Sequence, residues 1–164
     1  MDILTYLLIA IGLSFDSFAV SVSGGIADSK IKFWNATKIA ISLALFQGGL
    51  PLLGWLLGDE LRTYIVYFDH WIAFILLSAI GLKMIYDHVS SKDDEKKLNL
   101  SHFWTLIGVS IATSIDALIV GVSFGITNEK IILASILITI VTYLAAMIGM
   151  LIGKTAAGRI NSYA

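Results

Sequence analysis

The chain contains no cysteine and a single proline, and only 14% of its 164 residues are charged. The absence of cysteine excludes disulfides, thiolate metal sites and thiol catalysis, and leaves oxygen and nitrogen atoms as metal ligands. The formal net charge is −1, so the chain carries no basic stripe of the kind that binds nucleic acid. No Lys or Arg precedes the first apolar run, so we expect this run to be retained and not cleaved as a signal peptide.

Long apolar runs make up most of the sequence. Hydrophobic residues account for 57% of the chain, and the mean hydropathy is +0.87. These values are typical of an integral membrane protein. A helix needs about 20 residues to cross the hydrocarbon core. Five runs approach or exceed that length, so we predict an all-α membrane protein with transmembrane helices at 3–26, 39–58, 69–88, 103–126 and 131–153.

Basic residues are distributed unevenly between the predicted connections. When alternate connections are assigned to opposite sides, nine of the eleven Lys and Arg residues fall on one side. Only Arg62 and Lys130 fall on the other. Positive charge favours the cytoplasm. The N-terminus should therefore lie outside, with the turn at 28–38, the polar loop and the tail after the fifth helix inside.

Two segments one hundred residues apart are similar: "SFDSFAVSVSGGI" (14–26) and "SIDALIVGVSFGI" (114–126). A gapless alignment of 14–31 with 114–131 gives nine identities in eighteen positions. Two short motifs, "GWLLG" and "GMLIG", also resemble each other in the helices that follow. Self-similarity of this kind indicates a duplicated unit.

The duplication predicts how the chain is organised. Residues 1–88 would form a first three-helix repeat, 89–102 a charged cytoplasmic loop, and 103–164 a second repeat with two helices and a short tail. Because three is an odd number, the second copy enters the membrane from the opposite side. We therefore predict inverted repeats, with the last helix of the second repeat missing, an arrangement typical of transporters.

An aspartate lies near the middle of the first and of the fourth predicted span. At a rise of 1.5 Å per residue, Asp16 and Asp116 are each about 2 Å from the midpoint of their run. An ionised aspartate facing lipid there would cost at least about 2.5–3.5 kcal/mol, so both should face the protein interior or a wet cavity. Gly12, one turn before Asp16, would allow close helix approach. The hydroxyl residues predicted to line a polar path with the aspartates are Ser14, Ser23, Ser114 and Ser123.

The only proline lies in the second predicted span, in "FQGGLPLLG" (46–54). Pro51 has no N–H to donate to the carbonyl of Gln47, and Gly48 and Gly49 make local distortion easier. The pattern predicts a break at membrane depth, where Gln47 would offer a backbone and an amide oxygen to a site. A kink that serves only helix packing is an equal alternative.

Two mid-membrane carboxylates with amide and hydroxyl oxygens favour Mg²⁺, Ca²⁺ or Mn²⁺ over copper or zinc. A divalent cation would neutralise the pair, and protons would compete for the same oxygens, which gives a route to antiport. Two other interpretations stay open. The aspartates of a membrane scaffold would hydrogen-bond neighbouring helices, and those of an intramembrane protease would act as general acid and base, although the GxGD signature is absent.

Together the two signatures resemble those of a known family. "GLSFDSFAVSVSGGI" (12–26) and "IATSIDALIVGVSFG" (111–125) are similar to the paired signatures of the small bacterial manganese efflux pumps, the MntP family. The similarity extends through "FQGGLPLLGWLLG", "HWIAFILLSAIGLKMIYD" and the charged central loop. It implies a plasma-membrane protein that exports Mn²⁺ by alternating access, with Mn²⁺ as transported substrate, no cofactor and no enzymatic activity. Export of another divalent cation or of a small solute is the alternative.

The resemblance also implies roles for single residues. Asp16 and Asp116 would be the transport-site carboxylates, with Gln47 as a polar group in the second helix. Gly25 and Gly125 would be the small residues that end the signature helices. Family members continue with a sixth helix, so either the chain is truncated, or a second copy of the chain or another subunit fills that position beside the membrane lipid.

Overall fold

The computed structural model describes residues 2–28, 30–65, 100, 102–127 and 129–162. Every regular element within these ranges is an α-helix, which confirms the predicted fold class. The predicted span at 69–88 lies outside the described residues. The helices are α1 (Ile3–Ala27), α2 (Phe33–Ile65), α4 (Phe103–Ala112), α5 (Ile115–Thr127) and α6 (Ile131–Ser162).

Three of these helices contain a stretch long and apolar enough to cross a membrane: Ile3–Ala27, Phe33–Gly58 and Ile131–Gly158. Together α4 and α5 form a fourth candidate span that is bent by 43°. Large apolar side chains are exposed along the helices; Leu8, for example, is 61% exposed. Lipid tails are as apolar as these side chains, so their exposure is expected in a bilayer. The chain is therefore a multi-pass membrane protein.

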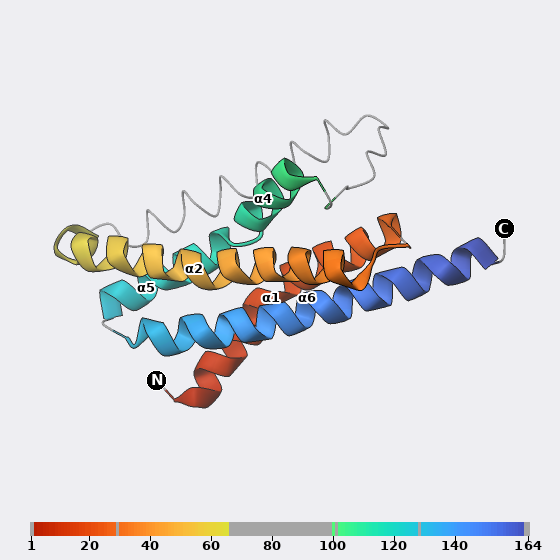
Figure 1. The fold of residues 1–164 in the computed structure, drawn as a ribbon. Helices are drawn as coiled ribbons and strands as arrows, with labels where there is room; N and C mark the ends of the chain where they lie inside the picture. The colour runs from red at the N-terminus through yellow and green to blue at the C-terminus, as the bar shows by residue number, and fades with distance from the viewer. Residues whose placement is uncertain (1, 29, 66–99, 101, 128, 163–164) are drawn as a thin grey trace, which may run out of the picture.

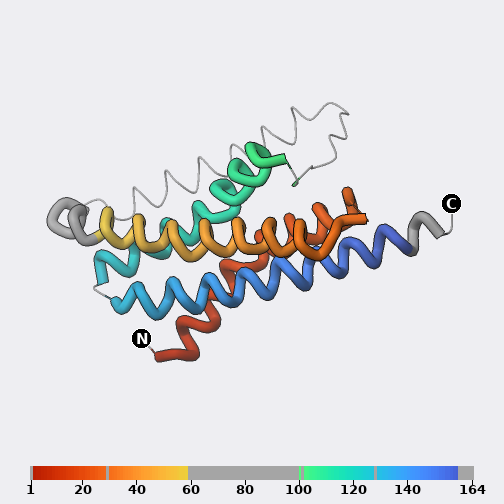
Figure 2. The backbone as a smooth tube through the Cα atoms, viewed as in Figure 1, coloured from red at the N-terminus to blue at the C-terminus, as the bar shows by residue number. Residues whose placement is uncertain are grey.

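Helices α1 and α6 run through the bundle in one direction, and α2, α4 and α5 run in the opposite direction (Figure 1). The end of α1, the beginning of α2 and the end of α6 gather at one end of the molecule, and the opposite helix ends gather at the other (Figure 2). Helix α1 packs mainly against α6, and α5 packs mainly against α2, with α2 and α6 in contact between them. The main contacts therefore follow the order α1, α6, α2, α5 around the bundle.

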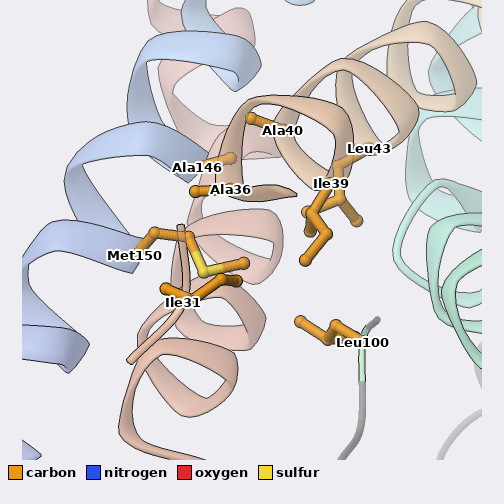
Figure 3. Packing of buried hydrophobic residues seen from close by; sticks show 8 residues of the cluster. All are labelled: Ile31, Ala36, Ile39, Ala40, Leu43, Leu100, Ala146 and Met150. Atoms are coloured by element: carbon orange, nitrogen blue, oxygen red, sulfur yellow. The ribbon is translucent and has the colours of Figure 1, made fainter. Parts of the chain in front are cut away.

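Buried apolar residues hold the long helices together. One cluster lies where α2 crosses α6 and includes Leu43, Ala146 and Met150 (Figure 3). A second cluster joins α1, α5 and α6 through the fully buried residues Ala10 and Ala117, among others. These contacts fix the position of α1 and α5 relative to the central pair.

The break that the sequence predicts at Pro51 is absent, because α2 is one continuous helix through this residue. Pro51 is fully buried, and a Cβ atom at Gly121 of α5 would overlap its backbone. The missing side chain of Gly121 gives Pro51 room within a packed helix contact. The break occurs instead in the fourth span, which the sequence predicts to be continuous.

Candidate functional site

The fourth span is interrupted at Thr113 and Ser114, where α4 ends and α5 begins. Both hydroxyls donate hydrogen bonds back into α4. Thr113 Oγ1 donates to the Val109 carbonyl at 3.0 Å, and Ser114 Oγ donates to the Ser110 carbonyl at 2.7 Å. The backbone N–H of Ser114 donates to the Ile111 carbonyl at 3.1 Å, three residues back where an α-helix has four. Side-chain bonds of this kind compete with the backbone ladder and bend helices.

The first span carries the equivalent serine without a bend. Ser14 aligns with Ser114, and its hydroxyl donates to the Ile11 carbonyl at 2.8 Å. The residue before it is Leu13, however, which has no hydroxyl, where the second signature has Thr113. Helix α1 runs through this point uninterrupted. The extra hydroxyl in the second signature gives a physical reason for the bend in only one of the two spans.

Gln47 of α2 lies at this bend with its side chain fully buried. Its amide nitrogen donates to the Leu13 carbonyl of α1 at 2.8 Å, and its amide oxygen accepts from the Ser114 hydroxyl at 2.9 Å. Ser114 has one hydroxyl proton, so this bond alternates with the bond to Ser110. A single side chain thus joins α1, α2 and the junction of α4 with α5.

The two signature aspartates meet beside the bend. Asp16 lies near the middle of α1, and Asp116 lies in the first turn of α5. Their carboxyl groups are within hydrogen-bonding reach of each other. Asp116 Oδ1 also accepts a hydrogen bond from the backbone N–H of Ala117 at 2.7 Å. The N-terminus of a helix favours negative charge, so the start of α5 stabilises a carboxylate at this point.

The hydroxyl residues predicted to form a polar path fall into two groups. Ser14 and Ser114 are buried and hydrogen-bonded. Ser23 and Ser123 are exposed, each about two turns beyond the aspartate of its helix. Both aspartates are themselves partly exposed. Each signature helix therefore has an accessible face that carries its aspartate and a serine.

The glycines of "GWLLG" and "GMLIG" lie at two equivalent helix contacts. A Cβ atom on any of these four glycines would overlap a backbone carbonyl oxygen of the helix beside it. The glycine–carbonyl pairs are Gly54 with Leu118, Gly58 with Val122, Gly149 with Phe18 and Gly153 with Val22. The partner residues on α5 and on α1 are one hundred positions apart. The second helix of each predicted repeat therefore packs on the first helix of the other, and this reciprocity supports the predicted duplication.

Three other glycines bear on the predicted helix packing. A Cβ atom on Gly25 would overlap the Met150 carbonyl oxygen, so α1 and α6 approach closely there. Gly125 is buried. Gly12 is exposed, and a Cβ atom built on it would meet no other atom within 4 Å. The described helices make no close approach at Gly12.

Several fully buried hydroxyls near the site are not among the residues singled out from the sequence. Those of Ser17, Ser21 and Thr142 have no hydrogen-bond partner within the described part of the chain. When the glycine motifs are aligned, Thr142 of α6 is equivalent to Gln47 of α2. Extending that alignment by two turns toward the N-terminus would have found it. The longer Gln47 side chain reaches two neighbours, whereas Thr142 reaches none.

Oxygen atoms dominate the chemistry of the site. Across the described ranges, no group of three His, Cys, Asp or Glu side chains lies close enough to hold a metal ion. A cation between Asp16 and Asp116 would take its other ligands from hydroxyl, amide or carbonyl groups, or from water. An all-oxygen set suits hard divalent cations. A site with only two charged ligands also favours release of the ion, which transport requires.

Polar contacts tie the helices together at both ends of the bundle. Near the N-terminus, the Tyr6 hydroxyl of α1 donates to Glu129 Oε2 at 3.0 Å. This hydrogen bond lowers the pKa of the Glu129 carboxyl. At the other end, Lys154 Nζ of α6 donates to the Ile31 carbonyl, just before α2, at 3.0 Å.

The model of the family described as "Putative manganese efflux pump" matches residues 30–164, well over half of the chain. The chain belongs to the MntP family. Several curated relatives named "Putative manganese efflux pump MntP" align over most of it. The relative from Rippkaea orientalis is 46% identical over 153 residues, which cover 93% of this chain and 82% of the relative. The relative from Gloeothece citriformis is 43% identical over 161 residues, 98% of this chain and 85% of the relative.

A further MntP relative, from Clostridium botulinum strain Hall, is 43% identical over an alignment of 164 positions. No solved structure matches the chain. Membership of the MntP family confirms the resemblance drawn from the two signatures, and it agrees with the apolar helices in indicating a membrane transporter.

Proposed function

We propose that this chain exports Mn²⁺ across the bacterial plasma membrane and that Asp16 and Asp116 bind the ion near mid-membrane. The observation that carries this proposal is the meeting of the two carboxyl groups, from separate helices, beside the bend between α4 and α5. The choice of Mn²⁺ rests on the names of the relatives. The location of the candidate binding site rests on the positions of the two aspartates.

The chemistry of the carboxylate pair suits a divalent cation. Two carboxylates balance the charge of Mn²⁺, and oxygen ligands match its hardness. Gln47 would be a third ligand, because an amide oxygen has two lone pairs and gives only one to Ser114. Without a metal, repulsion between two adjacent carboxylates would favour protonation of at least one of them. Binding of Mn²⁺ would release that proton, so export would be coupled to proton movement in the opposite direction.

The bend at Thr113 and Ser114 would be the moving joint of an alternating-access cycle. Asp16 lies on a continuous helix that packs closely on α6. Asp116 lies directly after the bend, so straightening or bending of the fourth span would move it relative to Asp16. The carboxylate pair would then open first toward the side of Ser23 and afterwards toward the side of Ser123. With the N-terminus outside, Ser23 lies on the cytoplasmic side of the site.

Total cell manganese in an exporter-deficient bacterium grown with MnCl₂ tests the function. We expect the chain to lower cell manganese, and we expect Asp16→Asn and Asp116→Asn each to abolish the effect at equal expression. Asp2→Asn is the matched control, because Asp2 is exposed at the start of α1 and its side chain makes no cap hydrogen bond. Retained export by either site variant would contradict the carboxylate site. If the unmodified chain leaves manganese unchanged and lowers another ion instead, the choice of metal is wrong.

A further inference from the structure

Two apolar grooves lie at opposite ends of the bundle, each between α2 and α6. One has a volume of about 250 Å³ and lies between the beginning of α2 and the end of α6. The other has a volume of about 620 Å³ and lies between the beginning of α6 and the end of α2. We call them the first and the second groove. Their linings are equivalent in the predicted repeat: Ile31 and Met150 line the first groove where Ile131 and Trp55 line the second.

Charge distinguishes the two grooves. Lys154 lines the first groove, and the exposed residues Lys30 and Lys32 lie on either side of Ile31, which also lines it. The acidic group nearest in sequence is Asp28, whose carboxylate accepts the backbone N–H of Lys30 at 3.2 Å. The first groove therefore has an excess of positive charge at its mouth.

In the second groove the charges of Glu129 and Lys130 balance each other. Glu129 also accepts the Tyr6 hydrogen bond. Each groove thus has its own apolar floor, and the two grooves differ in the net charge at the mouth. The second groove can serve as an internal control for the first.

The mouth of the first groove has donors available for an anion. The Lys154 ammonium has three protons, and the Ile31 carbonyl accepts one of them. Helix α2 begins at Phe33, directly after Lys32, so the positive end of its helix dipole lies at the mouth of the first groove. Lys38, one turn further along α2, extends the positive surface and lies 5.8 Å from the centre of the Trp34 ring.

We propose that the first groove binds an anionic phospholipid, with an acyl chain on its apolar floor and the phosphate at Lys30, Lys32 and Lys154. The groove lies on candidate membrane spans, where a lipid tail is at hand and a soluble anion is not. A second copy of the chain related by a two-fold axis would bring lysines against lysines, which disfavours self-association at this face. With the N-terminus outside, the first groove faces the cytoplasmic leaflet, where anionic lipids concentrate.

Tryptophan fluorescence in vesicles with brominated lipid tests this proposal directly. The four natural tryptophans are replaced by Phe, and Phe33→Trp places one reporter in the first groove, where Phe33 is 74% exposed. A second protein keeps only Trp55, in the second groove. Each is reconstituted with phosphatidylcholine that contains brominated phosphatidylglycerol or brominated phosphatidylcholine at the same mole fraction.

We expect the brominated anionic lipid to quench the reporter at position 33 more strongly than the brominated zwitterionic lipid. Trp55 should show no preference. At the first groove, each lysine replaced by glutamine should lower the preference for the anionic lipid by roughly fivefold. The variants are the double substitution Lys30→Gln with Lys32→Gln and the single substitution Lys154→Gln. High salt should lower it too, because exposed charges are screened. Lys130→Gln, at the second groove, should leave it unchanged.

Equal quenching by the two lipids at position 33 would overturn the proposal, as would a preference that survives loss of all three lysines. If neither lipid quenches this reporter while circular dichroism shows intact helices, then protein covers the groove and the proposal is also wrong. None of these outcomes depends on manganese transport. The lipid site and the proposed function can therefore fail independently.

Discussion

Gln47 and Thr142 occupy equivalent places on the two central helices, and they differ in what their side chains reach. Gln47 joins the Leu13 carbonyl to the Ser114 hydroxyl. The Thr142 hydroxyl is fully buried and has no partner among the described residues. A buried polar atom without a partner costs free energy, whereas a paired amide contributes to stability. The equivalent positions should therefore respond in opposite ways to an apolar substitution.

We predict that Gln47→Met lowers the free energy of unfolding by about 1–3 kcal/mol, because it leaves Ser114 without its Gln47 acceptor and removes a bond to α1. The matched variant Thr142→Val has nearly the same shape and removes an unpaired hydroxyl, so it should be neutral or stabilising. Thermal unfolding in detergent, followed by circular dichroism, measures both. A Thr142→Val protein as unstable as Gln47→Met would show that the threonine hydroxyl has a partner. An unchanged Gln47→Met protein would show that the amide does not hold the helices.

At the scale of the helices, most of the fold can be predicted from hydropathy, and the helix break cannot. A run of about 20 apolar residues locates a span, because a helix that crosses the hydrocarbon core must be apolar over that length. It underestimates α2, which runs from Phe33 to Ile65 and extends beyond the predicted run at both ends. The proline rule fails at Pro51 because the contact with Gly121 is a tertiary effect. Paired hydroxyls bend a helix more weakly than proline, so "ATS" at 112–114 gives little sequence signal.

The bend should straighten when the hydroxyls that bond back into α4 are removed. We predict that Thr113→Val with Ser114→Ala shifts the distance between labels at Gly108→Cys and Thr127→Cys, on α4 and α5, toward longer values. Both positions are exposed, and the chain has no other cysteine. Double electron–electron resonance in metal-free buffer measures the distance distribution.

The equivalent positions on α1 provide the control for the bend. Labels at Leu8→Cys and Ala27→Cys should report the same distance in the parent and in the Thr113→Val, Ser114→Ala protein, because α1 is continuous and packs along α6. If the Gly108–Thr127 distance also stays unchanged, the bend is rigid and is not the moving joint. If both distances change, the substitution has disturbed the whole bundle.

At the scale of the whole molecule, the sequence predicts which residues are equivalent but not which helices touch. The hundred-residue alignment pairs α1 with α4 and α5 together, yet α1 packs mainly on α6 and α5 packs mainly on α2, in each case a helix of the other predicted repeat. The two glycine motifs mark which helices touch, because each of their glycines faces a backbone carbonyl of the neighbouring helix, α5 for the first motif and α1 for the second. The same limit applies to the site: hydropathy and depth predict that Asp16 and Asp116 face inward, whereas only the packing of four helices shows that they meet.

The orientation of the molecule can be tested at Lys30 and Lys130, which are exposed and equivalent in the alignment. The predicted inverted repeat places them on opposite sides of the membrane. We predict that an impermeant maleimide labels Lys130→Cys on intact spheroplasts and labels Lys30→Cys only after the membrane is permeabilised. The physical reason is the excess of basic residues on the side of Lys30, which favours the cytoplasm. Each variant removes one positive charge from its own side, so neither abolishes the bias.

The pattern of labelling separates two parts of the proposal. The reverse pattern would keep the inverted repeat and place the N-terminus inside. The first groove would then face the outer leaflet. Labelling of both cysteines from the same side would contradict the inversion itself. The reciprocal contacts of α1 with α6 and of α5 with α2 would then need another origin, because helices that enter from opposite sides are what make the two halves equivalent across the membrane.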